Sequence, residues 1–260
     1  MANGVTLKTH NGQDVAFVDE VKAQGGMKDV YFSPNKDYVV SIFRHKHHAI
    51  AREPLIPITD THRVRIFNQE GGAYWRDLFC WPTAVVEYQG RLGVVAPFYH
   101  KKFFFTVGSR NGDTLGIKGR DKEGKWFASA KHRNRFIDPQ ELGDWSTHVK
   151  ICLMIARAVR RLHAAGLAHS DLSYKNVLVD PVTGAACVID IDGLVVPGKI
   201  PPQVAGTPDF IDPLVMMSQK LSLADPNRVL PSNKSDQHAL AVLIYMYLFY
   251  RHPLRGPKVH

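Results

Sequence analysis

Apolar and polar residues alternate along several short stretches in the N-terminal part of the chain. The alternation is clearest at residues 5–9, 14–18 and 38–44, and a repeat of two residues is typical of a strand with one buried face. Asn11-Gly12 separates the first two stretches, and this dipeptide is a strong signal for a tight hairpin turn. The chain is therefore predicted to begin with antiparallel strands.

A second hairpin is predicted further along. Residues 84–88 and 92–97 are largely apolar and flank Gln89-Gly90, which suits a turn. Between the two hairpins, Asp60 is predicted to cap a short helix that runs on to Phe67.

The pattern changes to a helical repeat in the second part of the chain. Asp144 is a predicted helix cap, Gly166 a predicted helix end, and apolar residues between them recur at helical spacing. Residues 239–250 are the most apolar run, twelve residues long. This run is shorter than the roughly 20 residues that a bilayer requires, so we predict a buried core helix and no membrane span.

The candidate chemistry lies after the first of these helices. Asp171 and Asn176 stand five residues apart, directly before the apolar residues 177–179. This arrangement suits metal-assisted phosphoryl transfer, in which the Asp accepts the proton of the attacking hydroxyl and the Asn oxygen holds Mg²⁺. A second apolar run then ends in Asp190-Ile191-Asp192, which delivers two further carboxylates.

These stretches resemble the motifs of protein kinases. Residues 169–176 are similar to the catalytic loop H-R-D-L-x-x-x-N, with Ser170 in place of Arg. Residues 206–213 look like the end of an activation segment, and residues 235–241 look like the start of the buried helix of the large lobe. By this resemblance Asp236 would brace the catalytic loop, and His169 would be a packed residue beneath it.

The resemblance runs from about Gly25 to Gly256 and implies a two-lobed α+β fold. The N-terminal lobe would be residues 1–98, and the C-terminal lobe would be residues 99–260, with an activation segment at 190–214. We expect this C-terminal lobe to be truncated relative to those kinases and to leave an apolar patch exposed.

The resemblance also implies roles for the candidate residues. Asp171 would be the catalytic base, Asn176 and Asp190 would hold Mg²⁺, and Asp192 would be a further metal ligand. Lys175 is a candidate contact for the ATP phosphates, because Ser173 stands where such kinases carry a Lys.

A glycine-rich loop is predicted at residues 23–31, where Gly25 and Gly26 would let backbone amides approach phosphate oxygens. The third predicted strand lacks the phosphate-binding Lys of kinases. Lys28 lies in the glycine-rich loop, as in the "with no lysine" kinases, and is the first candidate for the missing cation. Arg44 is the second candidate, on the opposite face of its strand from Ser41. Glu70 and Glu53 are alternatives for the carboxylate that pairs with this cation.

The connection between the lobes is predicted at residues 96–99. Trp81-Pro82 before a strand pair that ends in Pro97 resembles the bacterial kinases associated with tellurium-resistance operons. The backbone of Ala96 and Phe98 would then hold the adenine of ATP.

Residues 101–143 are predicted to be a basic insertion. Between residues 101 and 135, ten Lys or Arg stand against three acids. Two interpretations remain, a docking surface for a protein substrate or regulatory partner and a solvated loop.

Composition adds three constraints. The net charge of +9 favours an acidic partner or a phosphate-bearing ligand, and no motif indicates nucleic acid. The three Cys have no metal-type spacing, and the N-terminus has no signal-peptide pattern, so a cytoplasmic protein is predicted.

The sequence thus predicts an ATP- and Mg²⁺-dependent protein Ser/Thr kinase. Two alternatives remain open. One is a pseudokinase scaffold, which the missing strand Lys and Ser170 favour. The other is a small-molecule phosphotransferase of the aminoglycoside-kinase type, although such enzymes generally lack a segment like residues 206–213.

Overall fold

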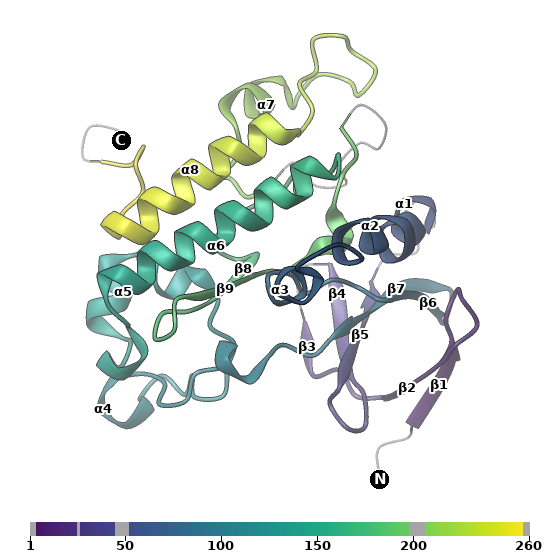
Figure 1. The fold of residues 1–260 in the computed structure, drawn as a ribbon, viewed down its shortest axis with the longest axis horizontal. Helices are drawn as coiled ribbons and strands as arrows, with labels where there is room; N and C mark the ends of the chain where they lie inside the picture. The colour runs from purple at the N-terminus through teal and green to yellow at the C-terminus, as the bar shows by residue number, and fades with distance from the viewer. Residues whose placement is uncertain (1–3, 25–26, 45–51, 198–205, 257–260) are drawn as a thin grey trace. The chain divides into compact units, whose positions relative to one another are not determined.

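The chain folds into two units, each with its own core. The computed structural model describes residues 4–24, 27–44, 52–197 and 206–256 (Figure 1). Unit 1 comprises residues 1–99 and the short stretch 190–192, and unit 2 comprises residues 100–189 and 193–260. Unit 1 is rich in strands and unit 2 is rich in helices, which confirms the predicted α+β fold class.

A five-stranded antiparallel sheet forms the centre of unit 1. Its strands are, in spatial order, β3 (Ala23–Gln24), β4 (Lys28–Phe32), β5 (Tyr38–Phe43), β7 (Arg91–Pro97) and β6 (Ala84–Tyr88). The first two strands, β1 (Gly4–Lys8) and β2 (Asp14–Val18), pair as a separate hairpin. Gly12 in its turn has a φ of +82°, a conformation that a side chain disfavours. Both predicted hairpins are confirmed.

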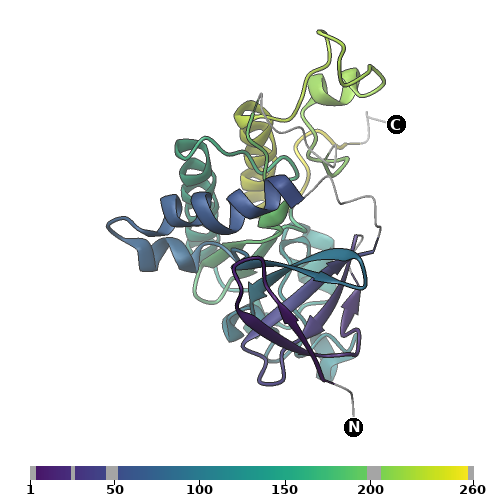
Figure 2. The ribbon, with the colours of Figure 1, turned by 90° about the vertical axis from the view of Figure 1, so that its right-hand side faces the viewer.

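The two faces of the sheet bury different sets of side chains. On one face Tyr31, Val40 and Ile42 pack against Phe17 of the β1–β2 hairpin, which lies against the sheet in Figure 2. On the other face Phe43 packs with Leu55, which comes from the helical segment that follows β5. Successive side chains of β5 therefore point to opposite faces of the sheet and contribute to the hydrophobic cluster on each face.

The helical segment of unit 1 begins earlier than predicted. It runs through α1 (Arg52–Pro57), a π-helical turn η2 (Ile58–His62) and α2 (Arg63–Phe67), followed by α3 (Gly72–Asp77). Asp60 is thus inside the segment and is not its cap. Its carboxylate instead lies 3.0 Å from His10 Nε2, so a tertiary contact rather than the helix end occupies this side chain.

Two long helices dominate unit 2. Helix α6 (Trp145–Ala164) begins at Asp144, whose side chain accepts from Thr147 N in a capping box, as the sequence predicts. Helix α8 (Asn233–Phe249) matches the predicted core helix. Within the described part of the chain, no helix has the length and apolarity needed to cross a bilayer.

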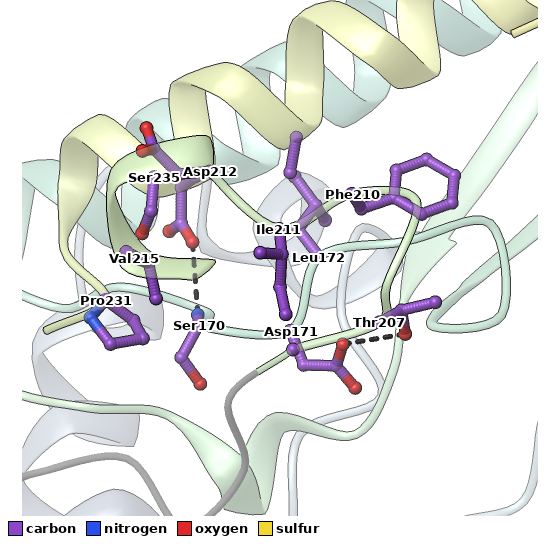
Figure 3. A pocket seen from close by; sticks show the side chains of 13 residues that line it. Ser170, Asp171, Leu172, Thr207, Phe210, Ile211, Asp212, Val215, Pro231 and Ser235 are labelled. Carbon is purple, nitrogen blue, oxygen red and sulfur yellow. Dashed lines mark hydrogen bonds between the residues drawn. The ribbon is translucent and has the colours of Figure 1, made fainter. Parts of the chain in front are cut away.

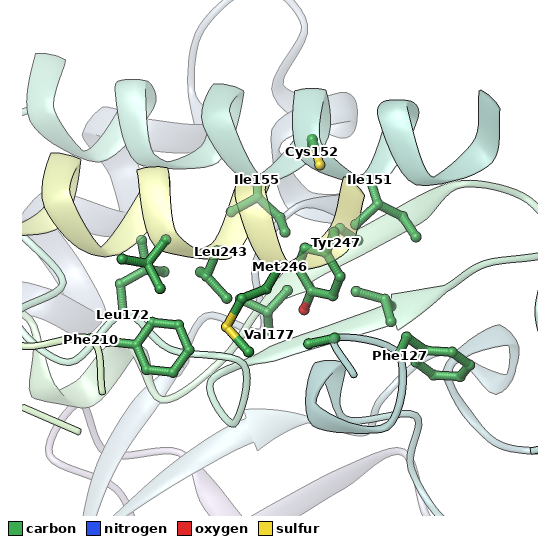
Figure 4. Packing of buried hydrophobic residues seen from close by; sticks show 14 of the residues in the cluster. Phe127, Ile151, Cys152, Ile155, Leu172, Val177, Phe210, Leu243, Met246 and Tyr247 are labelled. Atoms are coloured by element: carbon green, nitrogen blue, oxygen red, sulfur yellow. The ribbon is translucent and has the colours of Figure 1, made fainter. Parts of the chain in front are cut away.

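The core of unit 2 lies between these helices and the β8–β9 hairpin (Val177–Asp180 and Ala185–Val188). Figure 4 shows Ile151 and Ile155 of α6 and Leu243 and Met246 of α8 gathered around Val177. The short helix α7 (Pro213–Ser218) precedes α8. Its Leu214 and Met217 are 64% and 77% exposed.

Residues 101–143 are neither irregular throughout nor merely solvated. They form five short helical turns, η3 (Lys101–Phe103), α4 (Arg110–Asp113), η4 (Gly124–Trp126), α5 (Ala130–Arg135) and η5 (Pro139–Glu141). Phe105, Ile117 and Phe127 are buried in the core of unit 2. The ammonium of the buried Lys122 lies 2.9 Å from Glu141 and 3.0 Å from Asp180 of β8. The segment is therefore an integral part of unit 2.

Candidate active site

The predicted catalytic loop connects α6 to β8, and its Asp171 carboxylate is held by two side chains. Asn176 Nδ2 donates to Asp171 Oδ2 at 3.0 Å and to the Asp171 carbonyl at 2.7 Å. Thr207 Oγ1 donates to Asp171 Oδ1 at 2.8 Å (Figure 3). Each carboxylate oxygen can accept further hydrogen bonds, so Asp171 keeps capacity for an acceptor hydroxyl.

The backbone of this loop is anchored from below by Asp236 of α8. This carboxylate is 1% exposed and accepts from His169 N at 2.7 Å and from Ser170 N at 3.1 Å. His163 Nε2 lies 3.0 Å from the same carboxylate. The predicted bracing role of Asp236 is confirmed. Ser170 has a φ of +65°, a strained conformation for a residue with a side chain, and the two hydrogen bonds hold it there.

The loop is also tied to the strand that leads to Asp190. His169 is 2% exposed, and its Nε2 lies 2.9 Å from the Ile189 carbonyl, which confirms its predicted packing role. Ile189 N donates to the Asn176 carbonyl at 3.0 Å, extending the β8–β9 ladder. Asp190 follows directly, with a φ of +60°.

In unit 1, Lys28 joins the two aspartates of the Asp-Ile-Asp triplet. Lys28 Nζ lies 2.6 Å from Asp190 Oδ1 and 2.9 and 2.8 Å from the two carboxylate oxygens of Asp192. Burial alone would lower the pKa of Lys28, but the charges of Asp192 and Asp190 outweigh it, and the net shift is upward. Lys28 is therefore a fixed cation in this cluster.

The register of β4 against β5 explains the position of Lys28. Lys28 stands opposite Phe43, so both side chains leave the same face of the sheet. Its ammonium lies 5.4 Å from the centre of the Phe43 ring. Arg44 projects from the opposite face, as predicted, where its Nε lies 3.0 Å from Asp29. Gly25 and Gly26 lie outside the described residues.

The remaining predicted positions are placed as follows. Ala96 is paired with Val39 in the sheet, and Phe98 N donates to the Asp37 carbonyl at 3.1 Å. Lys175 is exposed on the catalytic loop, and Glu70 is exposed in the turn between α2 and α3. The side chain of Glu53 is outside the described part of the structure.

Sequence reasoning assigned no role to Cys80, which belongs to the same cluster as Lys28. Its Sγ lies 3.4 Å from the Pro97 carbonyl at the predicted interlobe connection. Burial and the negative charge of Asp192 raise the pKa of Cys80 to about 12, so the thiol is protonated at neutral pH. No spacing rule could have linked Cys80 to Asp192, because the two are distant in sequence.

Each unit offers oxygen donors of the kind that Mg²⁺ prefers. Asp190 and Asp192 already share one cation, the Lys28 ammonium, and carboxylate oxygens are the ligands that Mg²⁺ prefers. Asn176 uses its amide nitrogen on Asp171, which leaves its amide oxygen as the group that can bind a metal. No group of three or more His, Cys, Asp or Glu suited to a metal occurs among the residues that the structure describes.

Comparison with known proteins finds similarity to kinases. Residues 140–194 match the model of the lipopolysaccharide kinase (Kdo/WaaP) family. Over 92 residues the chain is 30% identical to a serine/threonine-protein kinase-like protein of Arabidopsis thaliana, covering 34% of this chain and 26% of that protein.

Solved structures show the fold of the whole chain. A rhoptry antigen kinase domain of Toxoplasma gondii superimposes with a TM-score of 0.58 at 15% identity, over 98% of this chain and 72% of that one. A second structure of that organism is described as a virulence factor with a protein-kinase fold and no enzymatic activity. It gives a TM-score of 0.54 at 16% identity, over 97% and 69%. The chain has a protein-kinase-like fold.

Proposed function

We propose that the chain is an ATP- and Mg²⁺-dependent phosphotransferase that acts on Ser or Thr hydroxyls of a protein. The observation that carries the proposal is the way the Asp171 carboxylate is held. Its carboxylate is oriented by Asn176 and Thr207, in a loop whose backbone is fixed by the buried Asp236. A carboxylate positioned this tightly, with unused lone pairs, suits a base that orients a hydroxyl and takes its proton.

The cluster of unit 1 supplies the other half of the chemistry. Bound Mg²⁺ and ATP would supply the transferable phosphoryl group and neutralise its developing charge. Asp190 and Asp192 of unit 1 would hold the metal, and the Asn176 oxygen of unit 2 is the further ligand that the kinase resemblance implies. Lys28 would hold phosphate oxygens, replacing the Lys that β5 lacks. The contact of Lys28 with both aspartates supports this role over a solvated surface Lys.

Residues 206–213 favour a protein as the acceptor. Thr207 bonds the base itself, and the buried Phe210 packs on Tyr174 of the catalytic loop with ring centres 4.9 Å apart. Residues 206–213 are thus fixed against the loop, in keeping with the resemblance to a protein-kinase activation segment.

Two other candidate functions have specific support. The match to the Kdo/WaaP family favours a sugar hydroxyl as the acceptor. Ser170 and the missing strand Lys favour a pseudokinase, and the fold also occurs in a protein described as having no enzymatic activity. The contacts of Lys28 and Asp171 favour activity over the pseudokinase.

Radiolabelled ATP with Mg²⁺ and a generic protein acceptor tests the proposal, with Asp171→Ala and Asp171→Asn as matched variants. We expect label transfer by the native chain and a loss of at least about 10²-fold in both variants. Transfer to a sugar acceptor alone would replace the protein substrate by a sugar. Tight ATP binding with no transfer to any acceptor would establish a pseudokinase.

A further inference from the structure

Unit 2 contains a groove of about 500 Å³ beside the catalytic loop. We call it the basic groove. Residues from two stretches, 125–132 and 246–255, line it together with Tyr174, Lys175 and Asp209. Its volume lies in the range of ligand pockets, which is about 300–1,000 Å³.

The side chains of the basic groove are strongly biased in charge. Lys125, Lys175, Arg251 and Arg255 line it, and Asp209 is the carboxylate of the lining. Glu123 lies outside the lining and pairs with Lys125 Nζ at 2.7 Å. Arg255 lies 2.5 Å from Asp209, and its side chain is 69% exposed. Ion pairs this exposed contribute little to stability, so their cations can exchange an internal partner for a ligand anion.

The basic groove is built into the fold. Lys125 N donates to the Tyr174 carbonyl at 3.2 Å, which joins residues 125–132 to the catalytic loop. Ala130 N donates to the Tyr250 carbonyl at 2.8 Å, which joins them to the end of α8. His252 Nε2 lies 2.9 Å from the Asp209 carbonyl. These contacts hold the walls before any ligand arrives.

Its floor is apolar and its sides are aromatic. Ala128 and Met246 are 1% and 7% exposed. Trp126 and Tyr174 line the groove as well, and Lys125 Nζ lies 5.9 Å from the Trp126 ring centre. Rigid aromatic rings beside cations suit a ligand that offers both carbon surface and negative charge, such as a peptide.

The basic groove is also connected to the base by short stretches of chain. Tyr174 and Lys175 belong to the same loop as Asp171. Asp209 comes shortly after Thr207, whose hydroxyl bonds Asp171. A ligand in the groove therefore lies against the two segments that position the base.

We propose that the basic groove binds an acidic segment of the protein substrate, with Glu or Asp residues close to the Ser or Thr that is phosphorylated. The inference rests on the proposed function for its acceptor hydroxyl. The volume suits a few side chains rather than a nucleic-acid duplex, which needs a wider run of phosphate contacts.

Binding measurements test the groove without requiring turnover. The probes are three fluorescein-labelled Ser peptides that differ only at the flanking positions, which carry Glu, Gln or Lys. Fluorescence anisotropy is measured for the native chain, Arg251→Glu, Lys125→Gln and the control Arg160→Glu, which changes the same charge on the exposed face of α6.

We expect the Glu peptide to bind the native chain at least about tenfold more tightly than the Gln peptide, and the difference to shrink as salt is added. Arg251→Glu should lose most of this preference and gain affinity for the Lys peptide, Lys125→Gln should lose part of it, and Arg160→Glu should keep it. A misfolded variant would not gain affinity for the Lys peptide, so this gain excludes misfolding as the cause of the lost preference.

Three results would overturn the inference. They are equal binding of the Glu and Gln peptides, a preference that Arg251→Glu leaves intact, and, with a fluorescein-labelled oligonucleotide as a fourth probe, binding tighter than that of the Glu peptide that Arg251→Glu abolishes. Label transfer can fail while the peptide preference persists, and the preference can fail while label transfer persists. Failure of the proposed function is therefore distinguishable from failure of the groove.

Discussion

Lys28 is the residue on which the interpretation of unit 1 depends. The sequence made it the first candidate to replace a missing strand Lys, but its partners could not be predicted from the sequence. The β4–β5 register places it beside Phe43, and the stretch 190–192 comes to it from the far part of the chain. Local patterns encode the strand and the charge, whereas this contact depends on tertiary folding.

Replacing Lys28 by Met should therefore impair nucleotide use. We expect kcat/KM for ATP to fall by about 10²–10³-fold, because one fixed cation on the phosphates is lost. The value for Lys28→Arg should lie between those of the native chain and Lys28→Met. Initial rates over an ATP series measure this, and Lys8→Met, on strand β1, is the matched control. Unchanged rates and ATP affinity in Lys28→Met would remove Lys28 from the site.

At the scale of elements, α8 acts as the support of the catalytic loop. Its first turn presents Asp236 to two backbone amides of that loop. This connection was predictable, because the motif around Asp236 is local and the resemblance supplied its partner.

Removing that carboxylate should cost stability as well as activity. Asp236→Ala leaves buried amide donors without an acceptor, and we expect a loss of about 3 kcal/mol in the free energy of unfolding. Asp236→Asn retains one acceptor oxygen and should lose less. Urea unfolding measures the difference, with the exposed neighbour Gln237→Ala as the control. A loss no larger than that of the control would contradict the supporting role.

Other elements show where sequence patterns were insufficient. The sequence predicted both long helices and both hairpins, because a helical apolar repeat marks α6, a continuous apolar run marks α8, and turn dipeptides separate the strands of the hairpins. The segment 101–143 carries none, because its Phe105, Ile117 and Phe127 enter the core from turns rather than from one face of a helix. Its charge suggested solvent exposure, yet Lys122 is buried between Glu141 and Asp180.

At the scale of the whole molecule, the fold was predictable because its motifs occur in a fixed order along the chain. The sequence could not show that residues 190–192 belong to unit 1. It also could not show that the basic residues near position 125 and those near position 251 line one groove. Both depend on contacts between distant parts of the chain.

The stability of the molecule should depend on pH through His148. This side chain is fully buried, and its Nε2 lies 2.9 Å from Arg133 Nη1. Burial and the Arg133 charge lower the pKa of His148 from 6.5 to about 4. Between these values the unfolded chain binds a proton that the folded chain does not, so stability falls as pH falls through this window, by up to about 3 kcal/mol.

Urea midpoints at pH 7.5 and pH 5 measure this effect. His148→Gln should flatten the difference between the two, because the variant has no imidazole to protonate on unfolding. His238→Gln on α8 is the comparison and should change the difference less. An identical pH dependence in His148→Gln and the native chain would exclude His148 as the cause.

The ion pairs of Lys122 have a consequence for protein engineering. Residues 125–132 of the basic groove belong to the segment 101–143, which cannot be exchanged as if it were a surface loop. Lys122 of this segment pairs with Glu141 within the segment and with Asp180 outside it. A chimera that takes this segment from another protein must therefore have oppositely charged residues at positions 122 and 180. Without them the chimera would bury a charge that has no partner, which is strongly destabilising.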